Sequence, residues 1–362
     1  MRPTLTQPAL IIALFACVLV SPWHIAGAAE SAVIFMYHHV AQDTPASTST
    51  SPARFEEQLE WLEANEFNVV PLETTLAALR NGESVPANAV IITFDDAYTS
   101  VLTEAAPLLE ARGWPYTIFV TTDYADGDYT GYLSWEALRT LAGRGATIGN
   151  HSKSHASFAR RLDGESTSAW RARIAEEISG AADRLTAELG ESVIDVLAYP
   201  YGEYDVEVKR IVAQQGLVAL GQHSGAAGAG TDWLAVPRFP VASGYDALDD
   251  FALRARSRPL NIDLIGDEIH IVDGGRQAVE GVVKSKDVRR SELACFAGGQ
   301  GRMTLQWIDA EAGHFVASPN ASLPPGRTKY NCTAPSATHN GVYHWFSYLW
   351  MTRRSDGTWY DE

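Results

Sequence analysis

The chain has 362 residues, 46% of them hydrophobic and 20% charged, so it can bury a sizeable core and is not a disordered protein. With 28 Lys and Arg against 44 Asp and Glu, its formal net charge is −16, which excludes a basic nucleic-acid binder. The acidic excess lies before Ile265, where 18 basic residues face 33 acidic ones; from Gly266 onward the numbers are 10 and 11. This shift in composition predicts two domains.

The N-terminus is typical of an export signal. Arg2 is its only charged residue, residues 9–20 are uninterruptedly apolar, and Ala26, Gly27 and Ala28 supply small residues for cleavage. Twelve apolar residues fall short of the roughly 20 that span a bilayer, so we expect no transmembrane segment. The prediction is a signal peptide over residues 1–28 and an exported protein, periplasmic or extracellular, with lipidation at Cys17 as the weaker alternative.

Residues 29–258 alternate short apolar runs with amphipathic helical patterns. Two such helical patterns are Phe55, Leu59 and Leu62, and the series that begins at Ile174 and Ile178. The expected strands are 33–37, 68–71, 90–94, 116–121, 146–149, 193–198, 217–221 and 234–238. Strands separated by helices predict parallel βαβ units, and most simply an α/β fold built as an irregular (β/α) barrel.

The pattern changes after residue 258. Residues 259–265 are expected to be a linker, and residues 266–362 a small all-β accessory domain of unknown role, because their runs are short, alternating and broken by Gly and Pro. Cys295 and Cys332 form an even pair there, which in an oxidising compartment favours a disulfide over two buried thiols. An aromatic cluster in this tail (Trp345, Tyr348, Trp350, Trp359 and Tyr360) suits either a hydrophobic core or the stacking of sugar rings.

Polar residues capable of chemistry follow the C-terminal ends of the expected strands. In order they are His38 and His39, Asp95 and Asp96, Asn150 and His151, Tyr199 to Gly202, and Gln222 and His223. Because these strand ends face one mouth of a parallel α/β barrel, we expect the five groups to converge on one active site. For Asp96 taken alone, a helix N-cap is the simpler interpretation.

His151 and His155 are spaced as two ligands, and with one carboxylate they would make a three-ligand metal site that leaves a position open for water. The sequence lacks Glu after the first His, which excludes the His-Glu-x-x-His metallopeptidase motif. It also lacks a Gly-x-Ser-x-Gly elbow, which disfavours a serine hydrolase.

Three motifs carry a family resemblance. Thr93-Phe94-Asp95-Asp96, then His151-Ser152-Lys153-Ser154-His155, then Tyr199-Pro200-Tyr201-Gly202 resemble, in this order, the NodB-homology polysaccharide deacetylases (carbohydrate esterase family 4). The opening Met36-Tyr37-His38-His39-Val40 is similar to the branch that includes poly-β-1,6-N-acetylglucosamine deacetylases. The resemblance covers residues 31 to about 256 and not the tail.

The resemblance implies a mechanism for removing acetyl groups. Asp96, His151 and His155 would bind a divalent metal, Zn²⁺ first and Co²⁺ or Ni²⁺ as alternatives, whose bound water is the nucleophile. Asp95 would be the general base, and the backbone N–H of Tyr201 would help hold the oxyanion. Tyr199, Pro200 and Arg238 are expected to contact substrate.

The sequence departs from the family pattern at two points. The usual late Leu-x-His motif that supplies the general acid is missing from its place, which leaves His38, His39 and His223 as candidates, with His38 favoured. Ala198 stands where the family has an Arg that orients the base. Arg238 is a candidate replacement, and a strand cap is its alternative role.

Three functions are compatible with these residues. The first is N-deacetylation of an N-acetylglucosamine-containing polysaccharide, and the second is an O-acetyl esterase of the xylan type with the same metal site. The third is an inert, secreted glycan-binding protein. An acetylated glycan is the expected partner, and the sequence indicates no oligomeric state.

Overall fold

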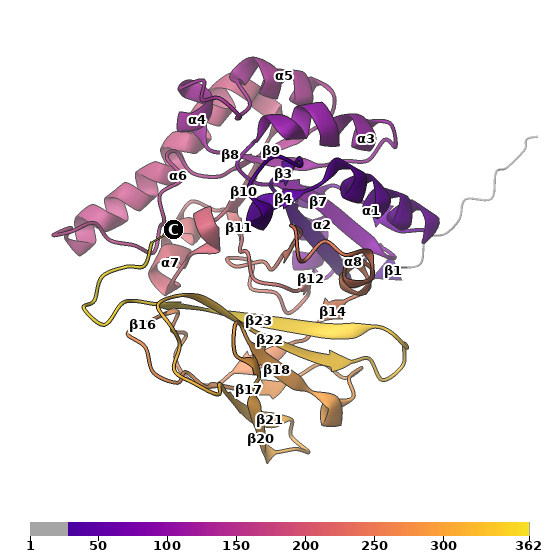
Figure 1. Cartoon of the computed structure of the whole chain (residues 1–362), viewed down its shortest axis with the longest axis vertical. Helices are drawn as coiled ribbons and strands as arrows, with labels where there is room; N and C mark the ends of the chain where they lie inside the picture. Colours follow the sequence, from indigo (N-terminus) through magenta and orange to yellow (C-terminus); the bar gives the residue numbers. More distant parts are fainter. Residues whose placement is uncertain (1–27, 362) are drawn as a thin grey trace, which may run out of the picture.

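The computed structural model describes residues 28–361, so the predicted signal peptide lies almost entirely outside the described residues. Within them, an α/β part comes first along the chain, and two β-sheets of the C-terminal region pack beneath it (Figure 1). Among the described helices, none is long and apolar enough to cross a membrane.

The central sheet of the α/β part is curled and mostly parallel. Its strands run in the order β11-β10-β9-β8-β7-β2-β12, with β5 added beside β7 and β13 beside β2. The strands are β2 (Ser31–Tyr37), β5 (Asn68–Val69), β7 (Ala89–Phe94), β8 (Thr117–Val120), β9 (Thr147–Asn150), β10 (Val193–Ala198), β11 (Val218–Leu220), β12 (Ala226–Gly228) and β13 (Phe239–Pro240). The predicted parallel α/β architecture is therefore confirmed as a curled sheet.

Three details of this sheet differ from the prediction. The expected strand at residues 234–238 is only a single bridge, between Leu220 and Val236, and the chain pairs with β2 three residues later, where β13 begins. Pro237 lies between these two pairings, and proline has no N–H to donate to a ladder. The short strand β12, which was not predicted, runs antiparallel to β2.

The helices cover the sheet with the faces that their apolar residues predict. They are α1 (Pro52–Ala64), α2 (Leu72–Arg80), α3 (Ala106–Glu110), α4 (Thr122–Asp126), α5 (Trp135–Gly143), α6 (Thr167–Leu189), α7 (Val206–Gln214) and α8 (Leu248–Ala255). Phe55, Leu59 and Leu62 of α1 are fully buried against alternate residues of β2 and β7, whereas α2 packs on the opposite face of these strands. Each strand is thus buried on both faces, as parallel sheets require.

The C-terminal region consists of mostly antiparallel strands arranged in two sheets, with β14 and β16 parallel to β23. One contains β14 (Arg258–Pro259), β16 (Ile271–Val272), β18 (Ala294–Ala297), β19 (Gly301–Arg302), β22 (Gly326–Pro335) and β23 (Tyr343–Thr352). The other contains β15 (Ile262–Leu264), β17 (Val279–Val283), β20 (Thr304–Asp309) and β21 (His314–Ser318). The segment predicted as a linker contains Pro259 of β14, which pairs with β23, and all of β15, which pairs with β17.

The two regions share hydrophobic core. Leu349 and Met351 of β23 are buried in the same cluster as Leu197, Tyr199 and Tyr204 of the α/β part. Among the tail aromatics, Tyr348, Trp350 and Tyr360 are buried, which favours the core interpretation of that cluster over an exposed sugar-stacking face. Whether the C-terminal region is a separate domain stays a prediction.

The predicted disulfide is present. Cys295 of β18 and Cys332 of β22 are directly opposite each other in the antiparallel ladder and are bonded. The bond links two neighbouring strands of the larger C-terminal sheet.

Candidate metal-dependent active site

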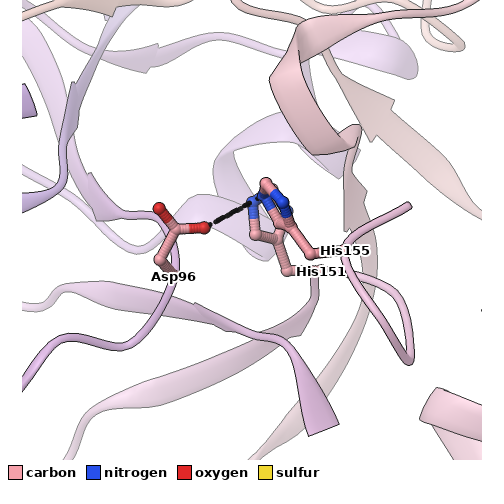
Figure 2. A group of neighbouring side chains, drawn as sticks. All are labelled: Asp96, His151 and His155. Atoms are coloured by element: carbon pink, nitrogen blue, oxygen red, sulfur yellow. Dashed lines mark ion pairs between the residues drawn. The ribbon is translucent and has the colours of Figure 1, made fainter. Parts of the chain in front are cut away.

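Three side chains that follow two parallel strands, β7 and β9, meet at one edge of the central sheet. Asp96 follows β7, His151 follows β9, and His155 lies four residues further on (Figure 2). The Oδ1 atom of Asp96 lies 3.3 Å from Nε2 of His151 and 3.1 Å from Nε2 of His155. Figure 2 shows the carboxylate and the two imidazoles pointing toward one another. The sequence-predicted ligand set is thus brought together in space.

The orientation of these atoms fits a bound cation. Nδ1 of His151 bonds to the carbonyl oxygen of Ala198 at 2.8 Å, so this nitrogen carries the proton and leaves the Nε2 lone pair directed into the site. Among the described residues, Nε2 of His151 and Oδ1 of Asp96 are buried without a hydrogen-bond partner. Buried polar atoms of this kind call for an explanation, and a divalent metal that uses the nitrogen and oxygen atoms as ligands supplies one.

The backbone around the site is held in unusual conformations. Asp96, Ser152, His155 and Tyr201 all have positive φ values, of 69°, 69°, 64° and 58°. Non-glycine residues in the left-handed region cost roughly 1–2 kcal/mol each, so surrounding contacts must hold them there. Such contacts exist; for example, the Oγ atom of Ser152 accepts a hydrogen bond from the N–H of His155 at 2.9 Å.

Asp95 lies beside this group and has a different partner. Its N–H continues the β2–β7 ladder by donating to the carbonyl of Tyr37, so its side chain follows the strand alternation onto the face of Ile91 and Thr93. There the guanidinium of Arg238 donates two parallel hydrogen bonds to the carboxylate, at 2.7 and 2.8 Å. Both side chains are fully buried. Arg238 therefore occupies the orienting position that Ala198 cannot fill.

The charges around the two aspartates keep both ionised. Burial would raise the pKa of Asp95, but Arg238 and His151 outweigh it and lower that pKa. Burial likewise opposes ionisation of Asp96, yet the imidazoles of His151 and His155 hold its pKa well below the usual range. The adjacent carboxylates thus have different partners, which fits one metal ligand and one base.

The three candidate histidines for the general acid lie in different places. Nε2 of His38 is 4.0 Å from Oδ2 of Asp96, at the edge of the metal group. His39 turns away and stacks on the ring of Tyr98 at 3.5 Å between ring centroids. Burial lowers the pKa of His38, although Asp96 and Asp95 oppose this effect.

His223 lies outside the cluster. It lines a cavity of about 390 Å³ between the α/β part and the C-terminal region, together with Tyr204, His270 and Tyr348. Burial and the nearby Lys329 lower the pKa of His223 to about 3, so its imidazole is neutral at physiological pH. The prediction that grouped His223 with the catalytic residues does not match this position.

The three residues that were predicted to contact substrate are buried beneath the site. Tyr199, Pro200 and Arg238 have buried side chains, which leaves them no exposed surface with which to contact a polymer. The ring of Tyr201, by contrast, packs edge-on against His155 at 4.5 Å. Tyr98 and Tyr132 (4.9 Å between ring centroids) and Tyr124 and Tyr132 (4.5 Å) continue this aromatic surface away from the metal group, and the sequence analysis had not singled them out.

Comparison with known proteins agrees with this geometry. Residues 82–220 match the family model described as polysaccharide deacetylase. The polysaccharide deacetylase homologue YxkH of Bacillus subtilis is 24% identical over 212 residues, which cover 58% of this chain and 71% of that protein. The poly-beta-1,6-N-acetyl-D-glucosamine N-deacetylase of Escherichia coli K12 is 41% identical over 69 residues, 19% of this chain and only 10% of that relative.

A solved structure shows the same fold. IcaB from Ammonifex degensii superposes with a TM-score of 0.55 at 24% identity, covering 63% of this chain and 97% of that one. The curled parallel sheet with a carboxylate and two imidazoles at its edge defines a hydrolase of the deacetylase class. Residues 82–220, which contain Asp95, Asp96 and both histidines of the group, are therefore the part of the chain that is similar to polysaccharide deacetylases.

Proposed function

We propose that the protein is a metal-dependent N-deacetylase that removes acetyl groups from a polysaccharide containing N-acetylglucosamine. The observation that carries the proposal is the pairing of two units: the Asp96–His151–His155 group and, next to it, the buried Asp95–Arg238 ion pair. The first suits a metal and the second a fixed, ionised base.

Asp96, His151 and His155 would hold the divalent metal, with zinc favoured by one oxygen and two nitrogen ligands. When bound, the metal would supply Lewis-acid activation of the acetamide carbonyl and of the attacking water. The chain's own residues then control the proton and the charge. In this proposal Asp95 accepts the proton of the attacking water, and Arg238 keeps its carboxylate ionised and correctly oriented.

The oxyanion and the leaving amine need further groups. The backbone N–H of Tyr201, held in the left-handed conformation beside His155, would donate a hydrogen bond to the oxyanion. His38 would donate a proton to the departing amine, since it is the histidine next to Asp96 that is not one of the three metal ligands. Tyr199, Pro200 and Arg238 would support the site from behind.

A glycan substrate is supported by the surroundings of the metal group. The rings of Tyr98, Tyr124 and Tyr132 are partly exposed next to His155, and exposed aromatic rings suit the apolar faces of sugars. The E. coli relative named above acts on poly-β-1,6-N-acetyl-D-glucosamine, which makes this polymer the first substrate to test. Export to the periplasm or beyond is part of the same proposal.

The test is acetate release from poly-β-1,6-N-acetylglucosamine oligomers, chitin oligomers and O-acetylated xylan by the metal-loaded protein. Release from the N-acetylated oligomers supports the proposal. Release from O-acetylated xylan alone would make the protein an esterase with the same site, and no release with no bound metal would make it a glycan-binding protein.

A further inference from the structure

The C-terminal region contacts the loop that carries Tyr201. This loop comprises residues 199–203 and lies directly after β10. Arg327 of β22 and Tyr360, near the end of the chain, form hydrogen bonds to this loop. Lys329 of β22 forms one to Gln222, which lies next to the loop. The chain's yellow C-terminal end returns beside α7 in Figure 1.

Arg327 makes the most direct of these contacts. Its guanidinium donates a hydrogen bond to the backbone carbonyl of Tyr201 at 3.0 Å and lies 5.5 Å from the centre of the Tyr201 ring. The same group is 3.8 Å from the carboxylate of Glu203. One side chain from the C-terminal sheet thus fixes the carbonyl, the ring and the charged end of the loop.

Tyr201 needs such support because of its backbone. Its φ of 58° and ψ of 3° place a bulky residue in the left-handed region, where the strain persists only if surrounding contacts hold it. The next residue, Gly202, also has a positive φ, and a Cβ atom there would lie 2.6 Å from Cβ of Gln222. The loop therefore packs tightly and has little freedom to relax.

Glu203 provides a second, buried anchor for the loop. Its carboxylate is fully buried and accepts hydrogen bonds from Arg160 at 2.7 and 2.9 Å and from Ser157 at 2.5 Å. The Tyr360 hydroxyl adds another at 2.7 Å. Lys329 donates to the carbonyl of Gln222 at 2.6 Å, on the neighbouring segment that Gly202 touches.

We infer that Arg327 is a positioning residue for the oxyanion-binding loop, and that the C-terminal sheet is consequently part of the deacetylase site rather than an appended binding module. The inference rests on the proposed function, because it assigns the N–H of Tyr201 to the oxyanion. Arg327 touches neither substrate nor metal ligand in this account. It acts by holding the carbonyl and the ring of Tyr201, and therefore the backbone conformation of Tyr201 that sets the direction of its N–H.

The test compares Arg327→Gln and Arg327→Lys with Arg353→Gln in the full-length, metal-loaded protein. Arg353 is a matched control, because it pairs with Asp273 on the surface of the same region without touching the loop. We expect Arg327→Gln to lower kcat by about 10- to 100-fold with little change in KM, because misplaced oxyanion donors slow the chemical step. Arg327→Lys should recover part of that loss, and Arg353→Gln should retain the wild-type kcat.

A second readout separates this inference from the proposed function. Amide hydrogen exchange of the peptide that contains residues 199–204 should become faster in Arg327→Gln and stay unchanged in Arg353→Gln, whatever the substrate. Metal content and melting temperature should match wild type. An unchanged kcat and unchanged exchange in Arg327→Gln would overturn the inference. If wild type releases no acetate from any N-acetylated oligomer, the proposed function fails, while the exchange result still tests the positioning.

Discussion

Arg238 donates two hydrogen bonds to the carboxylate of Asp95, at 2.7 and 2.8 Å, although the two residues are 143 positions apart in the sequence. It also donates to the carbonyl of Gly221 at 2.9 Å, so the guanidinium is itself held in one orientation. A bidentate, buried pair of this kind fixes both the direction and the charge of the base. In this protein the arginine comes from the segment between β12 and β13, not from the last residue of β10, which is Ala198.

Removing the arginine is predicted to harm both stability and catalysis. Arg238→Met leaves Asp95 as a buried carboxylate without its main partner, which costs about 3–5 kcal/mol of unfolding free energy. The same change raises the pKa of Asp95, so less of the base is ionised near pH 7. Denaturant titration and the pH profile of kcat measure the two effects. A stable variant with an unchanged pH profile would contradict this role of Arg238.

Asp95→Asn is expected to lower kcat by about 10²- to 10⁴-fold through loss of the proposed base. It should also lower the melting temperature, because Arg238 keeps a hydrogen-bond acceptor of nearly the same shape but loses its buried counter-charge. Metal content should stay at the wild-type level, since Asp95 is not one of the three proposed ligands. Acetate release measures the loss of activity, and elemental analysis measures the metal content. Loss of metal in this variant would mean that the two aspartates exchange roles.

Metal removal should abolish activity reversibly. Chelation is expected to stop acetate release, and one equivalent of Zn²⁺ per chain should restore it, because three ligand atoms lie within 4.8 Å of one another. His151→Ala should bind no metal when it is given the same single equivalent of Zn²⁺ per chain. His314→Ala is the matched control, since His314 pairs with Glu280 in the C-terminal region. Full activity of the chelated protein would exclude the metal mechanism.

Deleting residues 266–362 is predicted to reduce activity equally on polymer and on short oligomers. The deletion removes Arg327 and also Leu349 and Met351, which share a buried cluster with Tyr199. Acetate release from oligomers of increasing length, with circular dichroism of the truncated chain, makes the comparison. A loss restricted to long polymer would instead identify the C-terminal region as a glycan-binding module.

A pH-dependent contact links the two regions. Glu268 accepts hydrogen bonds from His270 at 2.8 Å and from Lys209 of α7 at 2.6 Å. The bond from His270, together with Lys209 and against the opposing effect of burial, lowers the pKa of Glu268 to about 2 from an ordinary 4.5. A depressed carboxylate pKa stabilises the fold above the unfolded-state value, and this stability is lost as the pH falls from about 4.5 toward 2.

Glu268→Gln should therefore melt at a lower temperature than wild type at pH 7, and the difference should shrink as the pH falls below about 4.5. Glu311→Gln is the control, because Glu311 is an exposed carboxylate of the same region. Thermal melts of the three proteins between pH 3 and pH 7 make the measurement. A difference that stays constant across this range would rule out ionisation of Glu268 as its source.

Much of the α/β part could be predicted from the sequence because its signals are local. Short apolar runs located β2, β7 and β10, and the motifs at strand ends placed Asp96, His151 and His155 at one edge. What local patterns could not show was which distant residues meet. The pairing of β14 and β15 with C-terminal strands removed the expected linker, because short strands gain their partners only in the folded chain.

The same limit applies to the site. Nothing near Arg327 in the sequence connects it with Tyr201, which lies 126 residues earlier. Glu203 was within reach of sequence reasoning, since it directly follows the Tyr-Pro-Tyr-Gly motif, and a buried carboxylate after such a loop calls for basic partners. His223 was misplaced because its strand end leads into the cavity beside the C-terminal region and not toward the metal group.

The most direct test of the central claim is acetate release from poly-β-1,6-N-acetylglucosamine oligomers, with metal content determined, for wild type, Asp95→Asn and His151→Ala. The account predicts that wild type holds one metal ion per chain and releases acetate. Asp95→Asn should keep the metal and lose the activity, and His151→Ala should lose both. Metal-loaded wild type that releases no acetate from N-acetylated oligomers, or an Asp95→Asn variant as active as wild type, would contradict the account.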